Sequence, residues 1–141
     1  MDAVTRAGRG MFMDAIRDDS CAQDRVRDWI SALRSGEYRQ SERALRTGDG
    51  YCCLGVACDL FDTNGWRSTD GGNWCYEAAS ERSVVNLPPR VRDAYALASM
   101  EGKYQERRSL MHLNDTGHPF GEIADFIEAN LNAALTAREA R

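Results

Sequence analysis

Apolar side chains recur at helical spacing in several parts of the chain. Between residues 20 and 36 they occupy the i, i+3, i+4 and i+7 positions that share one helix face, at Val26, Trp29, Ile30 and Leu33. The segment Ser20-Cys21-Ala22-Gln23 has the form of a capping box, and Gly36 stands where a helix C-terminus favours glycine. We predict an amphipathic helix that begins at a Ser20 cap and ends before Gly36.

Three more apolar stripes predict further helices. The first, over residues 11–17, contains Met11, Phe12, Ala15 and Ile16. The second follows Pro88-Pro89, which suit a first helical turn, and continues through Val91, Tyr95, Ala96 and Ala98 to an end at Gly102. The third begins near Pro119 and contains Phe120, Ile123, Ala124, Ile127, Leu131 and Leu135.

Residues 48–61 join a glycine-rich turn to an apolar run that contains three of the five cysteines of the chain. At 3.6 residues per turn, one wide face of this run comprises Cys53, Leu54, Ala57, Cys58, Leu60 and Phe61. We predict a buried helix whose N-terminus lies near Cys52 or Cys53.

The remaining segments predict extended structure. Residues 37–46 lack helical spacing and indicate an extended or hairpin-like connector that ends in a turn at residues 47–50. Residues 72–76 indicate a short strand, which we expect to pair with a strand near Tyr38. The predicted fold is α+β and mainly helical, with about five helices and a small two- or three-stranded antiparallel sheet. We expect a flexible tail over residues 1–10 and a single compact domain over residues 11–141.

Composition narrows the expected partners and compartment. The net charge of −4 disfavours a nucleic-acid partner. The chain has no basic start followed by a long apolar run, so we expect neither a secretory signal nor contact with a membrane. An odd number of cysteines without an export signal is typical of reduced thiols in a cytoplasm.

Several segments together resemble a family of small proteins that many bacteriophages and prophages encode. They are residues 29–40 (WISALRSGEYRQ), 51–56 (YCCLGV), 113–117 (LNDTG) and 120–128 (FGEIADFIE), and the resemblance spans roughly residues 29–131. It implies a phage accessory protein that acts in the cytoplasm of an infected bacterium, and it supplies no catalytic residues. His118 stands where the pattern more often has a small polar residue, which argues against a catalytic role for His118.

The cysteine helix also predicts an anion site. Backbone N–H groups after Gly50 are free to bind an anion at a helix start, and arginine forks suit phosphate. The candidate ligand-binding residues are Tyr38, Arg39, Arg43, Arg46, Gly50, Tyr51, Cys52, Trp74, Asn114 and Asp115, with Trp66 as a further stacking surface. Two alternatives stay open here: Asp49 caps the helix and fills the anion position itself, or Asn114-Asp115 serves only as turn chemistry.

A cysteine-dependent hydrolase is the alternative chemistry. Cys52 or Cys53 would be the nucleophile, His112 or His118 the base, and Asn114 or Asp115 would orient that base. The competing interpretation is that these cysteines pack as small apolar side chains. Adjacent cysteines followed by a gap of four do not match the spacing of zinc ligands, so we expect no metal and no cofactor.

The sequence therefore favours a phage-type, non-catalytic binding protein in the cytoplasm of the infected host. We expect it to counteract host defence by sequestering a phosphate-bearing small molecule such as a nucleotide signal. The alternatives are the cysteine hydrolase and an inhibitor that binds a host defence protein directly. The sequence does not decide between a monomer and a homo-oligomer.

Overall fold

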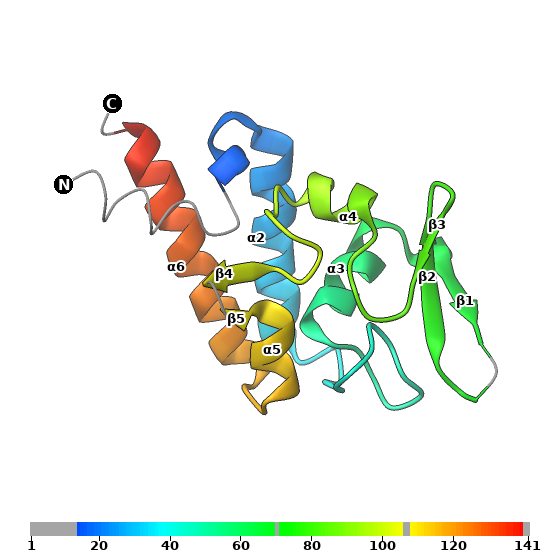
Figure 1. Ribbon diagram of the computed structural model, residues 1–141. Coiled ribbons are helices and arrows are strands. Elements are labelled where there is room, and N and C mark those ends of the chain that lie inside the picture. The colour runs from blue at the N-terminus through cyan, green and yellow to red at the C-terminus, as the bar shows by residue number, and fades with distance from the viewer. Residues whose placement is uncertain (1–13, 70, 106–107, 140–141) are drawn as a thin grey trace.

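The computed structural model describes residues 14–69, 71–105 and 108–139; the tail predicted over residues 1–10 lies outside them. These residues form five α-helices, two short 3-10 helices and five strands (Figure 1). The elements in chain order are η1 (Asp14–Asp18), α2 (Ser20–Ser35), α3 (Cys53–Phe61), η2 (Thr63–Gly65), β1 (Trp66–Ser68), β2 (Trp74–Ala78), β3 (Glu81–Ser83), α4 (Pro89–Ala94), β4 (Lys103–Gln105), β5 (Arg108–Ser109), α5 (Leu110–Asp115) and α6 (Phe120–Glu139). The α+β class, the five helices and the small antiparallel sheet are confirmed.

The helices form one side of the molecule. Figure 1 shows α2 and α6 packed side by side, with α3 between α2 and the sheet. The predicted stripes are buried at this interface, since Trp29, Ile127 and Leu131 are at most 2% exposed. Trp29 also ties α2 to α3, because its Nε1 donates a hydrogen bond to the carbonyl of Cys53 at 2.9 Å. None of the helices in the described ranges has both the length and the apolar character needed to cross a bilayer.

The ends of α2 are those of a well-capped helix, with one correction. The N-cap is Asp19 and not Ser20, because the Asp19 carboxylate accepts the N–H of Ala22 at 2.9 Å. At the other end, Gly36 has φ 81°, the left-handed conformation predicted for it. The helix predicted over residues 11–17 is instead the 3-10 turn η1, and residues 11–13 lie outside the described ranges.

The pairing predicted for residues 72–76 is wrong. Strand β2 lies in the middle of an antiparallel sheet of order β1-β2-β3, with Trp66 opposite Tyr76 and Tyr76 opposite Ser83. The partners of β2 are therefore its neighbours in sequence and not a strand near Tyr38. Strands β4 and β5 form a second, two-stranded antiparallel pair, which no sequence pattern predicted.

Helix α4 is shorter than predicted. It ends at Ala94 because Ala96 adopts φ 54° and the N–H of Leu97 returns to the carbonyl of Arg92 at 3.0 Å. This is the Schellman arrangement, in which the left-handed residue is usually glycine. Gly102, the predicted end, lies well beyond it. Ala98, predicted on the inner face, is exposed.

The connector before α3 is extended, as predicted, and it folds back on itself around Tyr51. The N–H of Tyr51 donates to the carbonyl of Arg39 at 2.8 Å, and Arg46 forms an antiparallel bridge with Tyr51. Between them, Thr47 and Gly50 exchange backbone hydrogen bonds across the tip of a tight turn. These contacts place Arg46 and Tyr51 beside each other at the start of α3. Every residue from Cys53 to Cys58 is buried, whereas Leu60 is 39% exposed, so α3 is buried all round in its first part and exposed at its end, and not buried along the predicted face.

Candidate ligand-binding site

The start of α3, where the sequence predicts an anion site, is closed by the protein itself. Cys52 is the N-cap, and its Sγ accepts the N–H of Gly55 at 3.3 Å. The N–H of Cys53 donates to Oδ1 of Asn114 at 3.1 Å, and these cysteines are buried. A Cβ on Gly50 would collide with the carbonyl of Arg39. The N–H groups of Cys53 and Gly55 are therefore already paired within the protein, and the competing prediction of an Asp49 cap is also wrong because Cys52 is the N-cap.

Asn114 provides the acceptor that a phosphate would otherwise supply. Its Oδ1 also accepts Nε2 of Gln40 at 2.9 Å, and its Nδ2 donates to the carbonyl of Ser41 at 2.8 Å. The side chain is fully buried. Asn114 is thus a structural residue that joins α5 to the connector and to the start of α3.

Gln40 and Asp115 extend the hydrogen bonds of Asn114. We call Gln40, Asn114 and Asp115 the polar joint. Nε2 of Gln40 donates to the carbonyl of His118 at 2.8 Å, and its Oε1 accepts the N–H of Phe120 at 3.1 Å, at the start of α6. Asp115 accepts the N–H of Arg43 at 2.9 Å, where Arg43 holds φ 75°. A non-glycine residue adopts that conformation at a cost, which this hydrogen bond offsets. The motifs that carry the family resemblance are therefore joined to one another by these side chains.

The cysteines have the environment of packing residues. Burial raises the pKa of Cys52 to about 12 and that of Cys53 well above its ordinary value. A nucleophilic cysteine instead needs a lowered pKa and access to substrate. His112 and His118 are exposed, and Nδ1 of His118 lies 3.1 Å from Oε1 of Glu122. This geometry does not support the hydrolase alternative. In the described ranges, no three His, Cys, Asp or Glu side chains are grouped so as to hold a metal ion.

Arg46, also on the connector, lies among aromatic rings and takes no part in the hydrogen bonds around Asn114. Its Cζ is 4.0 Å from the ring centroid of Trp74, 5.0 Å from that of Tyr51 and 5.4 Å from that of Trp66. The N–H of Trp74 donates to the carbonyl of Arg46 at 3.3 Å, which fixes the arginine backbone against β2. We call Arg46, Tyr38, Tyr51, Trp66 and Trp74 the Arg46 cluster.

The guanidinium of Arg46 is not paired with a carboxylate of any described residue. Within the part of the chain that the structure describes, it forms neither an ion pair nor a hydrogen bond, although the residue is half-buried. A guanidinium carries five N–H donors in a planar fork that matches phosphate and carboxylate. The cluster therefore presents unused donors beside aromatic faces.

Asp59 holds the rings of this cluster in place. Its carboxylate accepts the hydroxyl of Tyr38 at 2.6 Å and Nε1 of Trp66 at 3.0 Å, together with Oγ1 of Thr63 at 2.9 Å. The ring of Tyr51 packs edge to face between those of Tyr38 and Trp66, at centroid distances of 5.0 and 5.8 Å. Burial, and then the hydrogen bond to Asp59, raises the pKa of Tyr38, so its hydroxyl stays protonated as the donor.

Asp59 is not among the site residues predicted from the sequence, although its position in α3 is a signal for such a role. Asp59 is the single charged residue in the otherwise apolar run of α3. A carboxylate on such a helix requires hydrogen-bond partners, which here are two aromatic residues of the candidate site.

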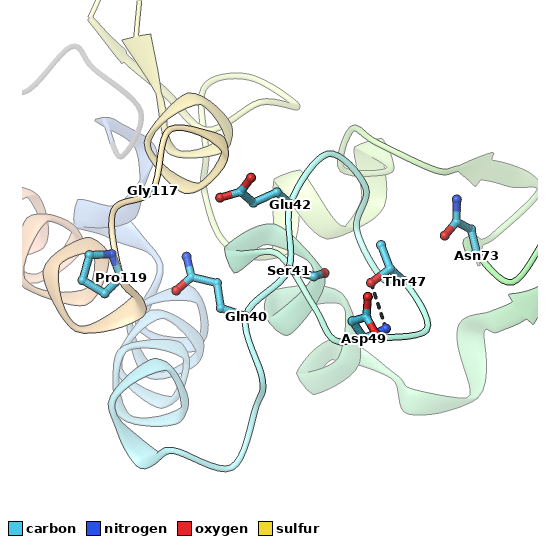
Figure 2. A pocket seen from close by; sticks show the side chains of 8 residues that line it. All are labelled: Gln40, Ser41, Glu42, Thr47, Asp49, Asn73, Gly117 and Pro119. Carbon is cyan, nitrogen blue, oxygen red and sulfur yellow. Dashed lines mark hydrogen bonds between the residues drawn. The ribbon is translucent and has the colours of Figure 1, made fainter.

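A hollow in the surface lies beside the polar joint, apart from the Arg46 cluster. Figure 2 shows it between Gln40–Glu42, the turn that bears Asp49, Asn73, and the segment from Gly117 to Pro119. Its volume is about 660 Å³, and none of its eight lining residues is basic. Glu42 and Asp49 contribute negative charge, which disfavours an anionic ligand in this groove.

The structure thus divides the predicted site residues into two groups. Tyr38, Arg46, Tyr51 and Trp74 come together with Trp66 in the Arg46 cluster. Cys52, Asn114 and Asp115 belong to the buried start of α3 and the polar joint, and Gly50 packs against Arg39. The side chains of Arg39 and Arg43 are exposed, and neither guanidinium lies over a ring of the cluster as that of Arg46 does.

Comparison with known proteins places the chain in a family. No curated protein and no solved structure matches it. A family model described as a domain of unknown function, DUF8296, matches residues 22–131. This range includes α2 from Ala22 onward, the whole Arg46 cluster, the polar joint and the first half of α6. The chain therefore belongs to the DUF8296 family.

Proposed function

We propose that the chain is a non-catalytic binding protein that takes a phosphate-bearing small molecule with a planar ring, such as a nucleotide, at the Arg46 cluster. The observation that carries this proposal is a half-buried guanidinium held among three aromatic rings, with no acceptor among the described residues.

The chemistry of the cluster suits such a ligand. The N–H groups of Arg46 offer a bidentate contact to a phosphate, and charge-assisted hydrogen bonds contribute about 1.5–3 kcal/mol each. The half-buried Tyr51 and Trp74 supply apolar ring surface for a base. Because Asp59 already orders the rings of Tyr38 and Trp66, little conformational entropy is lost when the ligand binds.

The biological setting comes from the resemblance to phage and prophage proteins. In that setting the chain acts in the cytoplasm of an infected bacterium and sequesters a nucleotide signal that host defence requires. Direct inhibition of a host defence protein is the alternative, and it becomes the first choice if no phosphate compound binds.

The test compares two arginines of the same connector. Thermal-shift screening of nucleoside monophosphates, diphosphates and cyclic phosphates is followed by calorimetric titration of the compounds that raise the melting temperature. Arg46→Ala should weaken binding about ten- to a hundredfold, since it removes one or more charge-assisted hydrogen bonds. Arg46→Lys should recover part of that loss, because it keeps the charge but not the planar fork.

Arg43→Ala is the matched control. Arg43 is exposed and outside the cluster, and alanine keeps a Cβ at the same left-handed position, so its backbone strain is unchanged. Binding by Arg43→Ala should equal that of the parent. The proposal fails if no phosphate compound stabilises the parent, or if Arg43→Ala weakens binding as much as Arg46→Ala.

A further inference from the structure

A fixed negative charge borders the Arg46 cluster, because the carboxylate of Asp59 accepts Nε1 of Trp66, the ring over which the guanidinium of Arg46 also lies. The carboxylate of Asp59 is held by three donors, two of which belong to rings that pack against Tyr51. Burial raises the pKa of Tyr51, Asp59 raises it further, and Arg46 lowers it. Asp59 and Arg46 therefore act electrostatically on the same ring.

Among the described residues, Arg46 is the one cation that lies over the rings of the cluster. Arg67 nearby on β1 is paired with Glu77 at 3.4 Å. The adjoining turn bears the carboxylate of Asp49. The local charge that a ligand meets is thus one guanidinium, partly offset by the carboxylate of Asp59 and, from the adjoining turn, by that of Asp49.

Binding at a site with one cation depends on the charge of the anion, because two opposing energies change differently with that charge. The cost of removing an ion from water rises with the square of its charge, whereas its attraction to a single cation rises only in proportion to that charge. Asp59 reduces the attraction further, and a doubly charged group feels this reduction twice as strongly as a singly charged one. A phosphomonoester carries a charge of about −1.5 to −2 at neutral pH, while a phosphodiester carries a single charge.

We infer that the Arg46 cluster prefers singly charged, ring-bearing phosphodiesters such as cyclic nucleotides over phosphomonoesters, and that Asp59 sets this preference. This inference rests on the proposed function and names the ligand class of the same site. Asp59 acts here as a positioning and specificity residue that does not itself contact the ligand.

The experiment titrates adenosine 3′,5′-cyclic monophosphate and adenosine 5′-monophosphate into the intact parent, Asp59→Asn and Glu128→Gln at pH 7.5 and one ionic strength. The two compounds share a base and a sugar and differ in phosphate charge. The parent should bind the cyclic diester more tightly. Asp59→Asn should shift the ratio of the two affinities toward the monoester by about two- to fivefold, as expected for one partly exposed charge.

Glu128→Gln is the matched control, because it removes the same charge from a carboxylate of α6 that is paired with Arg34 of α2, outside the cluster. It should leave the ratio unchanged. If Asp59 mattered only for ring packing, Asp59→Asn would weaken both compounds equally. That result, or a parent that binds the monoester at least as tightly, would overturn the inference.

If Asp59→Asn does not fold, the parent still tests the inference. The ratio of its affinities for the cyclic diester and the monoester can contradict the inference by itself. Failure of the proposed function looks different, because neither compound would then bind the parent at all.

Discussion

The side chain of Asn114 is fully buried, yet all of its hydrogen-bonding capacity is used. Its Oδ1 accepts from Cys53 and Gln40, and its Nδ2 donates to the carbonyl of Ser41 and, at 3.3 Å, to Asp115. A buried amide with every group paired favours one arrangement of the segments around it over all others. The polar joint therefore specifies how α5 meets the start of α3.

Removing this side chain should be costly. Asn114→Ala leaves the N–H of Cys53 and the carbonyl of Ser41 buried without partners, and each unpaired group costs about 1–3 kcal/mol. We expect a loss of about 2–5 kcal/mol in the free energy of unfolding, measured by urea denaturation. Asn132→Ala, at an exposed position of α6, should change it by less than about 0.5 kcal/mol. Equal effects of the two substitutions would contradict the role assigned to the joint.

At the scale of elements, α3 depends on a close approach to the connector. A Cβ on Gly55 would collide with the carbonyl of Leu45. Leu45 is in turn held on both sides, because its N–H donates to Val84 and its carbonyl accepts from Cys52. Glycine at position 55 is therefore required by packing, although it lowers helix propensity.

A pair of glycine substitutions tests this contact. Gly55→Ala should lower the free energy of unfolding by about 1–3 kcal/mol, because the backbone of Leu45 has little room to shift. Gly121→Ala in α6 meets nothing within 4 Å and should be neutral or stabilising by up to about 1 kcal/mol. Thermal and urea denaturation of both variants would decide; a stabilised Gly55→Ala protein would show that α3 is not pressed against the connector.

At the scale of the whole molecule, the core buries several groups that ionise only at high pH. Burial raises the pKa of the thiols of Cys52, Cys53 and Cys58. It also raises the pKa of the tyrosines Tyr38, Tyr76 and Tyr95. The native state thus keeps protons that the unfolded chain releases, and rising pH favours unfolding.

The contribution of these buried groups to stability should therefore be constant below the ordinary cysteine pKa of about 8.5 and fall above it. Each buried thiol contributes a slope of up to about 1.4 kcal/mol per pH unit, until the pH reaches its raised native pKa. Urea denaturation between pH 7 and 9.5 under reducing conditions measures this slope. Cys58→Ala should reduce the slope of the free energy of unfolding against pH by the contribution of one buried thiol. Cys21→Ala, at an exposed position, should leave the slope unchanged. A free energy of unfolding that does not change with pH would contradict the burial of the thiols.

Local patterns in the sequence were sufficient for the fold class and for α2, α3 and α6, but not for the 3-10 turn η1 or for the early end of α4. The spacing of Val26, Trp29, Ile30 and Leu33 and the glycine at position 36 determine α2, because helix faces and caps depend on residues a few positions apart. The same holds for α6 and for the buried start of α3 near Cys52. Arginine and aromatic residues on the connector and β2 also indicated the candidate site before its geometry was known.

Contacts between distant segments were decided only by the tertiary structure. Asn114 reaches the start of α3 across 61 positions and fills the place predicted for an anion. Tyr38 meets Asp59 across 21 positions, and Arg46 rather than Arg39 or Arg43 lies over the rings. Periodicity states which face of an element is apolar, but not which surface covers it. Which surface covers it depends on how all the side chains pack together. For this reason the candidate site is not the predicted helix start but an arginine among aromatic rings.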